Sequence, residues 1–380
     1  MIKIKTLISP VLVGLSLIAC GGSEQISEES KDLTIPFSEA EEFKLTDFVE
    51  EQQYILLSTE EAALFNRVDK LIAKNDRYYL FDHLAESGIL VFDKEGNFLQ
   101  KIGEFGEGPQ QLKGITDFQV ADNGELQVLD KLRKSIVIYS PEGIWKEKVK
   151  LPVNAGGFAQ LGDKWALAIN YDNQADSLIS NQILGIFAND MQVDSLYFHY
   201  PEGADNVNLY YHAGLLNAGK NTLIYHRPPN DTISFFTSTG DLSKRLVIDF
   251  GENRLPEEAV NDFDIVSSYK KQEASYRYLQ TPALLAGDNI FGIILSTKQE
   301  FWTFAYRISS QELYTTKVDM TQLHLKDMLL PTAYRDDNVL ISMIDPVTFS
   351  RDAQPAAYPE EVRIYLENEG SVLLLHHLKP

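Results

Sequence analysis

The stretch 77-RYYLFDHLAESGILVFDKEGNFLQKIG-103 decides how this 380-residue chain folds. It contains three short apolar runs, at 77–82, 88–93 and 97–103. Residues 93–97 (DKEGN) join the last two runs and carry the Asp and Gly that tight turns require. Runs of about six residues have the length of strands and are too short for ordinary helices. The stretch therefore predicts consecutive β-strands.

The same pattern returns further along the chain. GELQVLD (124–130), SIVIYS (135–140), PEG (141–143) and IWKEKVKL (144–151) follow in the same order, and Gly143 lies 47 positions after Gly96. Fainter copies follow, with longer gaps towards the C-terminus. The six expected turns lie at or near Gly96, Gly143, Asp190, Gly240, Ser310 and Gly370.

Repeats of about 40–50 residues with several strands each are typical of β-propellers. Six turns predict an all-β fold, a six-bladed propeller of four-stranded antiparallel blades over residues 43–380. Stacking the blades around an axis buries apolar faces that a single blade leaves exposed, and closing the ring removes most free strand edges. We expect YILLST (54–59) to pair with the last blade and close the ring, and 252–280 to be the main insertion.

The glycine-rich segment KIGEFGEGPQQ (101–111) has two interpretations. A phosphate-binding loop needs a following helix and usually a lysine, whereas this segment carries Glu104 and Glu107 and no amphipathic helix follows. The two carboxylates would repel a polyphosphate. The segment therefore predicts a crossover between two blades.

The N-terminus has the pattern of an export signal. MIKIK is basic, TLISPVLVGLSLI (6–18) is apolar and shorter than the roughly 20 residues of a membrane span, and a small residue precedes Cys20. Residues 17–20 (LIAC) resemble the lipobox of bacterial lipoproteins, and Cys20 is the only cysteine in the chain. We expect a signal peptide at 1–19, lipidation of Cys20, and a flexible acidic tether at 20–42.

The chain is strongly acidic, with 34 Lys and Arg against 55 Asp and Glu and a formal net charge of −21. A surface of this sign repels the phosphate backbone of nucleic acids. Nucleic acid is therefore an unfavourable partner. The expected partners are a membrane, through the N-terminal lipid, and a glycan, a peptide or an outer-membrane protein.

The segments VFDKEGNFLQKIGEFGEGPQQL (91–112), DNGELQVLD (122–130) and IVIYSPEG (136–143) resemble the NHL-type repeat. More closely, they resemble the six-bladed propeller lipoproteins of Bacteroidetes. That resemblance implies a binding propeller of the cell envelope, in a glycan-utilisation or envelope-complex setting, and no catalytic residue. Gly21 after the cysteine, in place of the Asp that retains many lipoproteins at the inner membrane, implies an outer-membrane lipoprotein that is periplasmic or surface-facing.

Two segments depart from the repeat and concentrate aromatic and basic side chains. Exposed aromatic rings beside hydrogen-bonding groups suit sugar or peptide ligands. The alternative is ordinary packing inside a blade, where tyrosine is common. The candidate binding residues, in NLYYHAG (208–214) and IYHRPPND (224–231), are Tyr210, Tyr211, His212, Tyr225, His226 and Arg227.

No motif for catalysis or metal binding stands out. HExxH, CxxC and GxSxG patterns are absent from the sequence, and we expect the neighbours His376 and His377 to face opposite sides of one strand. Asp82, Asp93 and Asp130 recur with the repeat, which favours hydrogen bonds at turns and strand ends. No cofactor is predicted. The alternative function is an NHL-like hydrolase or lyase with calcium in the central channel, which no DxDxDG-like loop supports.

Overall fold

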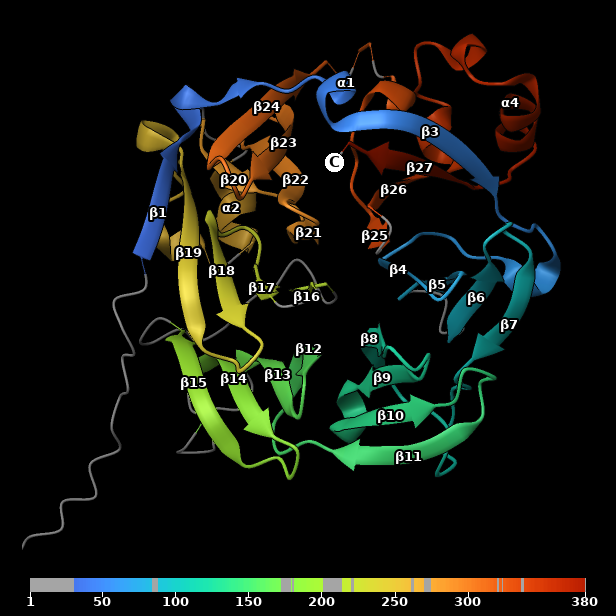
Figure 1. The fold of residues 1–380 in the computed structure, drawn as a ribbon, viewed down its shortest axis with the longest axis vertical. Coiled ribbons are helices and arrows are strands. Elements are labelled where there is room, and N and C mark those ends of the chain that lie inside the picture. The colour runs from blue at the N-terminus through green and yellow to red at the C-terminus, as the bar shows by residue number, and fades with distance from the viewer. Residues whose placement is uncertain are drawn as a thin grey trace, which may run out of the picture.

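Six sheets surround a common centre in the computed structural model (Figure 1). Each sheet is built on four strands that pair antiparallel in series from the centre outward, and two of the sheets carry additional strands. The chain is therefore a six-bladed β-propeller, as the repeat predicts. The structure describes residues 31–83, 88–171, 179, 181–200, 214–219, 222–260, 263–269, 275–319, 321–322, 324–335 and 338–379.

The first three blades follow one another in the chain, each running from its innermost to its outermost strand. The first contains β4 (Lys70–Lys74), β5 (Arg77–Phe81), β6 (Ile89–Asp93) and β7 (Phe98–Ile102). The second contains β8 (Ile115–Val120), β9 (Leu126–Asp130), β10 (Ser135–Tyr139) and β11 (Trp145–Lys150). The third contains β12 (Ala155–Leu161), β13 (Lys164–Ile169), β14 (Gln182–Ala188) and β15 (Val193–His199).

The last three blades carry additions to this plan. The fourth contains β16 (Leu216–Ala218), β17 (Thr222–Tyr225), β18 (Thr232–Thr237) and β19 (Leu242–Asp249). In the fifth, β20 (Arg277–Leu279) and β21 (Leu284–Ala286) both pair with β22 (Asn289–Ser296), and β23 (Phe301–Arg307) and β24 (Glu312–Val318) follow. The sixth contains β25 (Ala333–Arg335), β26 (Val339–Ile344), β27 (Val372–Leu378) and, outermost, β3 (Val49–Leu56).

Strand β3 closes the ring, because it precedes the first blade in the chain but pairs with the last (Figure 1). Its register with β27 runs from Val49 opposite Leu378 to Leu56 opposite Val372. The prediction that 54–59 would clasp the terminal blade is confirmed for 54–56. The residues beyond the strand continue to the first blade, where the Ser58 N–H donates to the carbonyl of Gly96 over 2.8 Å.

Part of the predicted tether is ordered. β1 (Lys31–Pro36) adds to the outer edge of the fourth blade by parallel pairing with β19, and β2 (Glu41–Glu42) pairs with β24 of the fifth. The prediction of a flexible segment is wrong for 31–42, because Leu33 and Ile35 alternate within an acidic sequence and pack on the core of blades four and five. The predicted signal peptide, Cys20 and tether residues 20–30 lie outside the described residues.

Each hydrophobic core lies between two blades, so neighbouring residues of a central strand belong to different cores. On β5, Leu80 packs with Ile341 and Leu373 of the sixth blade, whereas Phe81 packs with Phe118 of the second. Central strands are consequently apolar on both faces: all five residues of β9 and of β10 are buried. The outermost strands contact solvent, and only intermediate or exposed residues occur in β11. Burial of this kind accounts for the continuous apolar runs in the sequence.

The repeated turn glycines bring each blade against the preceding one. Gly96, Gly143 and Gly240 have φ values of 90°, 80° and 90°, a region that side chains disfavour. A Cβ at Gly96 would overlap the carbonyl oxygen of Leu56 in β3, and one at Gly240 would lie 2.8 Å from Ile186 of the third blade. Asp190, which marks the turn expected in the third blade, lies between β14 and β15 as predicted.

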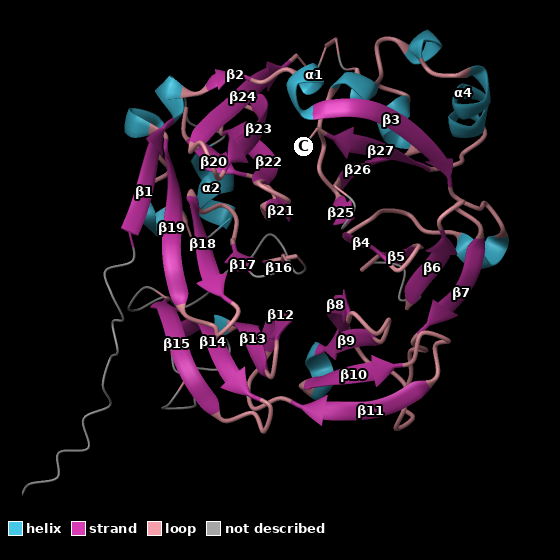
Figure 2. Ribbon diagram, in the orientation of Figure 1, coloured by secondary structure: helices cyan, strands magenta, loops and turns pink. Residues whose placement is uncertain are grey.

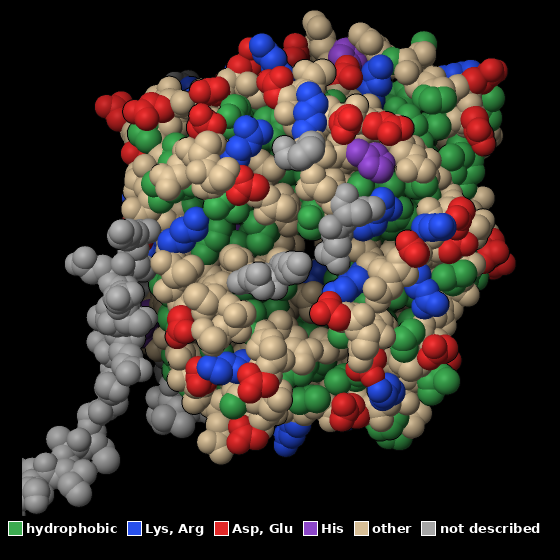
Figure 3. Space-filling model, in the orientation of Figure 1, with side chains coloured by type: hydrophobic (Ala, Val, Ile, Leu, Met, Phe, Trp, Pro, Cys, Tyr) green, Lys and Arg blue, Asp and Glu red, His purple; other side chains and the backbone are tan. Residues whose placement is uncertain are grey.

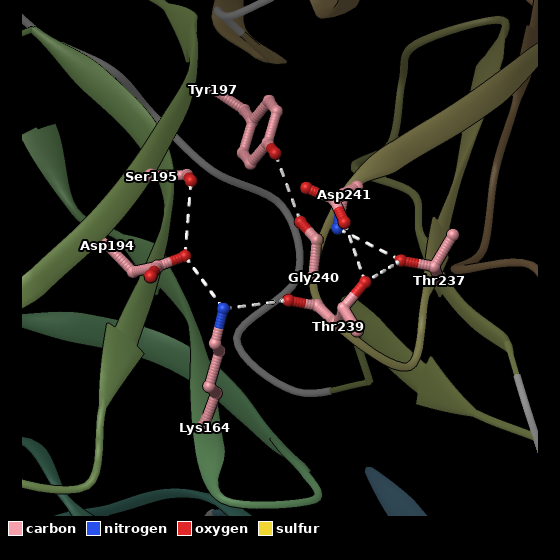
Figure 4. Close-up of polar contacts among 8 residues, drawn as sticks. All are labelled: Lys164, Asp194, Ser195, Tyr197, Thr237, Thr239, Gly240 and Asp241. Carbon is pink, nitrogen blue, oxygen red and sulfur yellow. Dashed lines mark hydrogen bonds and ion pairs between the residues drawn. The ribbon is translucent and has the colours of Figure 1, made fainter. Parts of the chain in front are cut away.

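Polar contacts reinforce the glycine turn of the fourth blade (Figure 4). Tyr197 of β15 donates its hydroxyl to the carbonyl of Gly240 over 3.1 Å. Lys164, at the start of β13, donates to Asp194 over 3.0 Å and to the Thr239 carbonyl over 3.1 Å. The hydrogen bond from Lys164 to Asp194 raises the pKa of the lysine. These contacts join the third and fourth blades on the face opposite to the long loops.

The expected sixth turn, at Gly370, is of a different kind. Gly370 follows a helix and precedes β27, so it is not a hairpin turn. The sixth blade has no covalent turn before its outer strand, because that strand is β3. The predicted number of six blades is correct, although the hairpin turn expected at Gly370 is not. The described helices are α1 (Leu45–Phe48), α2 (Phe263–Tyr269), α3 (Pro346–Phe349) and α4 (Glu360–Glu367), and they lie in connections (Figure 2).

Single turns of 3-10 helix also occur in the connections. Their bounds are Phe37–Glu39, Glu61–Ala63, Lys131–Arg133, Gly251–Asn253, Glu257–Ala259, Leu325–Asp327 and Pro355–Ala357. The predicted insertion at 252–280 contains α2, whereas the sequence pattern missed the insertion at 345–371, which holds α3 and α4. Among the described helices, none has the length and apolar character needed to cross a membrane.

The segment 101–111 is a blade crossover, as predicted, because it leads from β7 to β8. Arg133 of the second blade donates one Nη to the carbonyl of Gly106 over 3.0 Å and the other to that of Gly108 over 2.9 Å. The glycine carbonyls therefore accept hydrogen bonds from the chain itself. This arrangement is structural and offers no phosphate cradle.

The recurring aspartates have the structural roles that their repetition predicts. Asp82 accepts the N–H of Asn66 over 2.8 Å, and Asp130 accepts that of Lys113 over 3.0 Å, so each fastens a connection to a strand end. Asp93 accepts from the backbone of its own turn, and these hydrogen bonds lower its pKa although desolvation opposes them.

Replacement of Gly96 by Ala tests the contact between blades. Gly162 also has a positive φ (58°), but a Cβ there meets no atom within 4 Å. We expect Gly162→Ala to lower the free energy of unfolding by about 1 kcal/mol, through backbone strain alone. Gly96→Ala should lower it by about 1–3 kcal/mol more, because of overlap with Leu56. Denaturant unfolding measures both; equal losses would contradict the role assigned to the turn.

Candidate functional site

The two faces of the ring differ in their connections. Short hairpin turns link first to second and third to fourth strands on one face. The opposite face, here called the long-loop face, carries the connections from second to third strands and from one blade to the next. It holds the longest connections of the chain, including 250–276 and 345–371. Long loops on a rigid scaffold are common positions for binding residues.

Three of the six candidate binding residues lie on the long-loop face, where β17 ends and the connection to β18 begins. Tyr225 is 6% exposed, His226 1% and Arg227 6%. They are therefore buried, whereas the sequence interpretation pictured exposed rings. The other three candidates, Tyr210, Tyr211 and His212, lie outside the described residues.

His226 joins the fourth blade to the fifth. Its Nδ1 accepts the N–H of Ala283 over 3.0 Å, and its Nε2 lies 3.0 Å from the carbonyl oxygen of Asn230. This geometry fits a neutral ring that accepts at Nδ1 and donates at Nε2. Burial lowers the pKa of His226 to about 4, so the ring is neutral at pH 7. His226 is a structural residue within the site.

Arg227 is the exceptional residue of this region. Within the described part of the chain, its Nε, Nη1 and Nη2 atoms are buried and have no hydrogen-bond partner. Its guanidinium carbon lies 4.7 Å from the centre of the Tyr200 ring, which is a cation–π distance. A buried guanidinium normally has hydrogen-bonded partners, because removing a charge from water is unfavourable.

Tyr225 presents a second unpaired polar group beside the arginine. Its hydroxyl is buried and has no hydrogen-bond partner among the described residues. Burial raises the pKa of Tyr225, and Arg227 opposes that rise through its charge and through a side-chain contact with the hydroxyl. The ring stacks on Phe198 with a centroid distance of 6.1 Å and an interplanar angle of 16°. Packing therefore holds the ring while its hydroxyl keeps hydrogen-bonding capacity.

Two further tyrosines from the third blade complete an aromatic wall. Tyr200 follows β15 and donates its hydroxyl to the Ile169 carbonyl over 2.8 Å. Tyr171, which is half-buried, meets Tyr200 edge to face at 5.2 Å between ring centres. The sequence analysis missed both residues, because each is an isolated tyrosine next to a strand. We call Tyr171, Tyr200, Tyr225 and Arg227 the Arg227 site.

Other arginines of the long-loop face have partners. Arg254 pairs with Asp231 over 2.7 Å, so the acid that follows Arg227 by four positions is already engaged. Arg133 donates to the carbonyls of the crossover. These two guanidinium groups are paired, whereas all three side-chain nitrogens of Arg227 are buried without a partner among the described residues.

The innermost strands carry a buried ion pair. Lys70 of β4 donates to Asp117 of β8 over 2.6 Å, and the second carboxylate oxygen of Asp117 accepts the N–H of Phe158 in β12 over 3.1 Å. The pair thereby joins three blades near the axis. Burial raises the pKa of Asp117, while the Lys70 charge and the backbone donors oppose that rise. No group of three or more His, Cys, Asp or Glu side chains arranged for a metal occurs among the described residues.

A small pocket of about 230 Å³ lies on the hairpin face, between the first and second blades. Arg77 in its wall donates to the carbonyl of Pro141 over 2.7 Å and is therefore engaged. Figure 3 shows one face of the whole propeller, on which acidic and basic side chains are interspersed around the outer edge. The residues lining this pocket are Asn75, Arg77, Tyr79, Asn123, Gly124 and Pro141.

The sequence matches the profile of a domain of unknown function, DUF4934, over residues 30–364. The chain belongs to the DUF4934 family. The matched range begins next to β1, covers the first five blades and ends before β27 of the sixth. No curated protein matches the sequence.

Solved structures with the same fold include two from Bacteroides. A Bacteroides fragilis protein named as exported is 15% identical, with a TM-score of 0.73 over 92% of this chain and 100% of that one. A Bacteroides vulgatus member of the DUF4221 family is 11% identical, with a TM-score of 0.53 over 87% of this chain and 97% of the other. At these identities the likeness establishes the propeller fold alone.

Two buried histidines predict a loss of stability in mild acid. His376, between Ser342 and Gln52, also has its pKa lowered to about 4, mainly by burial. The unfolded chain binds these protons near pH 6.5 and the folded chain near pH 4, so stability is lost as pH falls through that interval. We expect each ring to contribute a loss of about 2 kcal/mol between pH 7.5 and pH 5.

Denaturant unfolding of the wild type, His226→Gln and His376→Gln at both pH values measures this effect. Each variant should have a smaller difference between the two pH values than the wild type, even if its stability is lower throughout. An unchanged difference in both variants would contradict the assignment.

Proposed function

We propose that this chain is a lipid-anchored, extracytoplasmic binding propeller that takes its ligand at the Arg227 site of the long-loop face. The observation that carries the proposal is the buried Arg227 guanidinium beside the Tyr225 hydroxyl, for which the described residues supply no well-formed hydrogen bond. A buried guanidinium without acceptors is unfavourable in the empty protein, and a bound ligand would supply the acceptors. The surrounding rings favour a ligand with an apolar face.

The proposed location rests on the N-terminus. The basic start, the apolar stretch at 6–18 and the motif that ends at Cys20 support export and lipidation. The fold shared with an exported protein of Bacteroides fragilis supports the same setting. Residues 21–30 would connect the lipid to β1 at the rim of the fourth blade. Anchored in this way, the propeller would stand close to the outer membrane.

The proposed ligand class follows from the aromatic wall. Tyr171 offers half-buried aromatic surface that the Tyr200 ring supports edge to face, and Tyr225 has a hydroxyl that can both donate and accept. Saccharides combine apolar ring faces with hydroxyl edges, so they match both features. A role in glycan utilisation or in an envelope complex agrees with this chemistry, and an outer-membrane protein partner fits the same setting.

Replacement of Cys20 by Ser tests the anchor. Without the thiol no thioether to lipid forms, so we expect the protein to leave the membrane fraction or to accumulate with its signal peptide uncleaved. Cell fractionation and the mass of the mature protein measure this. Unchanged membrane association of the variant, with the same mass, would remove the lipoprotein assignment.

A glycan array probed with the full chain in detergent tests ligand binding. We expect retention of at least one class of saccharide, and at least tenfold weaker binding by Tyr171→Ala, which removes half-buried aromatic surface from the site. Tyr314→Ala is the matched control: this tyrosine packs on Phe48 in the fifth blade, away from the site. Absence of binding to every saccharide, or equal losses in the two variants, would count against the proposed function.

A further inference from the structure

We infer that Arg227 receives the carboxylate of an acidic saccharide, so that the ligand of the Arg227 site is a uronic acid or a glycan bearing one. The inference rests on the proposed function and names the ligand chemistry of the same site. Three features of the described residues lead to it: the unpaired guanidinium, the charge balance around it, and the aromatic surfaces beside it.

The guanidinium is positioned to receive a planar anion. The ring of Tyr200 covers part of it at 4.7 Å, which is the cation–π arrangement and engages its flat face. The N–H donors lie in the plane of the group, and in the described part of the chain they have no well-placed acceptor. A carboxylate matches this edge with two parallel hydrogen bonds, the arrangement in which arginine binds carboxylates most favourably.

The charges of the described residues around Arg227 favour a ligand with one negative charge. Burial keeps the Tyr225 phenol protonated, and His226 is a neutral ring held by Ala283 and Asn230. Asp231 is occupied by Arg254 at 2.7 Å. Among the described residues, Arg227 therefore contributes a single positive charge without a paired acid. A carboxylate balances it, whereas a phosphate dianion would leave excess negative charge in a buried setting.

The groups beside the arginine favour a sugar as the carrier of that carboxylate. The buried Tyr225 hydroxyl contacts the guanidinium and has no well-formed hydrogen bond among the described residues, so it can pair with a ring hydroxyl of a bound sugar. The Tyr171 ring stands edge to face with Tyr200 and offers its half-buried surface to the apolar face of the ligand. The site thus presents acid-binding, hydroxyl-binding and ring-binding groups together.

The first test compares sugars that differ in the group at C6: a carboxylate, a hydroxymethyl group and a sulfate ester. The full chain in detergent is titrated with D-glucuronate, D-glucose and D-glucose 6-sulfate by calorimetry, at constant ionic strength. We expect D-glucuronate to bind at least tenfold more tightly than D-glucose, and Arg227→Met to weaken D-glucuronate binding at least 100-fold. Preference for the sulfate, or equal binding of D-glucuronate by wild type and variant, would overturn the inference.

A second test measures stability without ligand. If Arg227 is kept for a ligand, its buried charge is unfavourable in the empty protein, and Arg227→Met should unfold at the same temperature as the wild type or at a higher one. Arg133→Met is the matched control, because it removes a partly buried guanidinium that donates to the carbonyls of Gly106 and Gly108. The control should unfold several degrees lower. An equal decrease in both variants would make Arg227 structural and overturn the inference.

The outcomes separate this inference from the proposed function. Tight binding of neutral saccharides that Arg227→Met leaves unchanged would preserve the binding propeller and overturn the carboxylate assignment. Binding of N-acetylphenylalanine in an Arg227-dependent manner, without binding of D-glucuronate, would replace the sugar by a peptide carboxylate. No binding of any saccharide, charged or neutral, would remove the proposed function together with the inference.

Discussion

Every blade of this propeller depends on burying its two apolar faces against two neighbours. Leu80 and Phe81 are consecutive residues, yet one packs on the sixth blade and the other on the second. A single four-stranded sheet with such residues on both faces would expose a core to water, so the blades are stable only as a closed set. The pairing of β3 with β27 completes that set. Interfaces between blades, more than individual hydrogen bonds, hold this fold together.

The repeated turn sequence follows from the same constraint. Two blades can approach closely only where the turn of one blade places no side chain against a strand of the preceding blade. Gly96 and Gly240 meet this condition, because each has a positive φ and a close neighbour in the preceding blade. The aspartates of the repeat fasten connections to strand ends, as Asp82 and Asp130 do. The feature that recurs in the sequence is therefore the contact between units. That relation explains how a short pattern around residues 77–103 specifies an entire ring.

The propeller, its blade count and the closing strand were predictable from the sequence, because turn spacing and strand length are local signals. The order of 31–42 was not, since Leu33 and Ile35 gain their partners only from blades far along the chain. The helix α4 was missed because Val362, Ile364 and Leu366 lie at every second position, a spacing that a strand also permits. At the site, composition found Tyr225, His226 and Arg227 but pictured them as exposed. It did not find Tyr171 and Tyr200, whose approach to Arg227 comes from a neighbouring blade.

The Arg227 site is informative because other charged groups near it and near the axis have partners. Lys70 and Asp117 neutralise each other near the axis, Arg254 neutralises Asp231, and Arg133 donates to carbonyls. A fold able to pair these groups had the means to pair Arg227 as well. The rigid blades fix Tyr200 and Tyr225 by packing, so an unfavourable charge between them does not collapse into another contact. The rigid propeller therefore keeps the guanidinium of Arg227 available until a ligand supplies the missing acceptor.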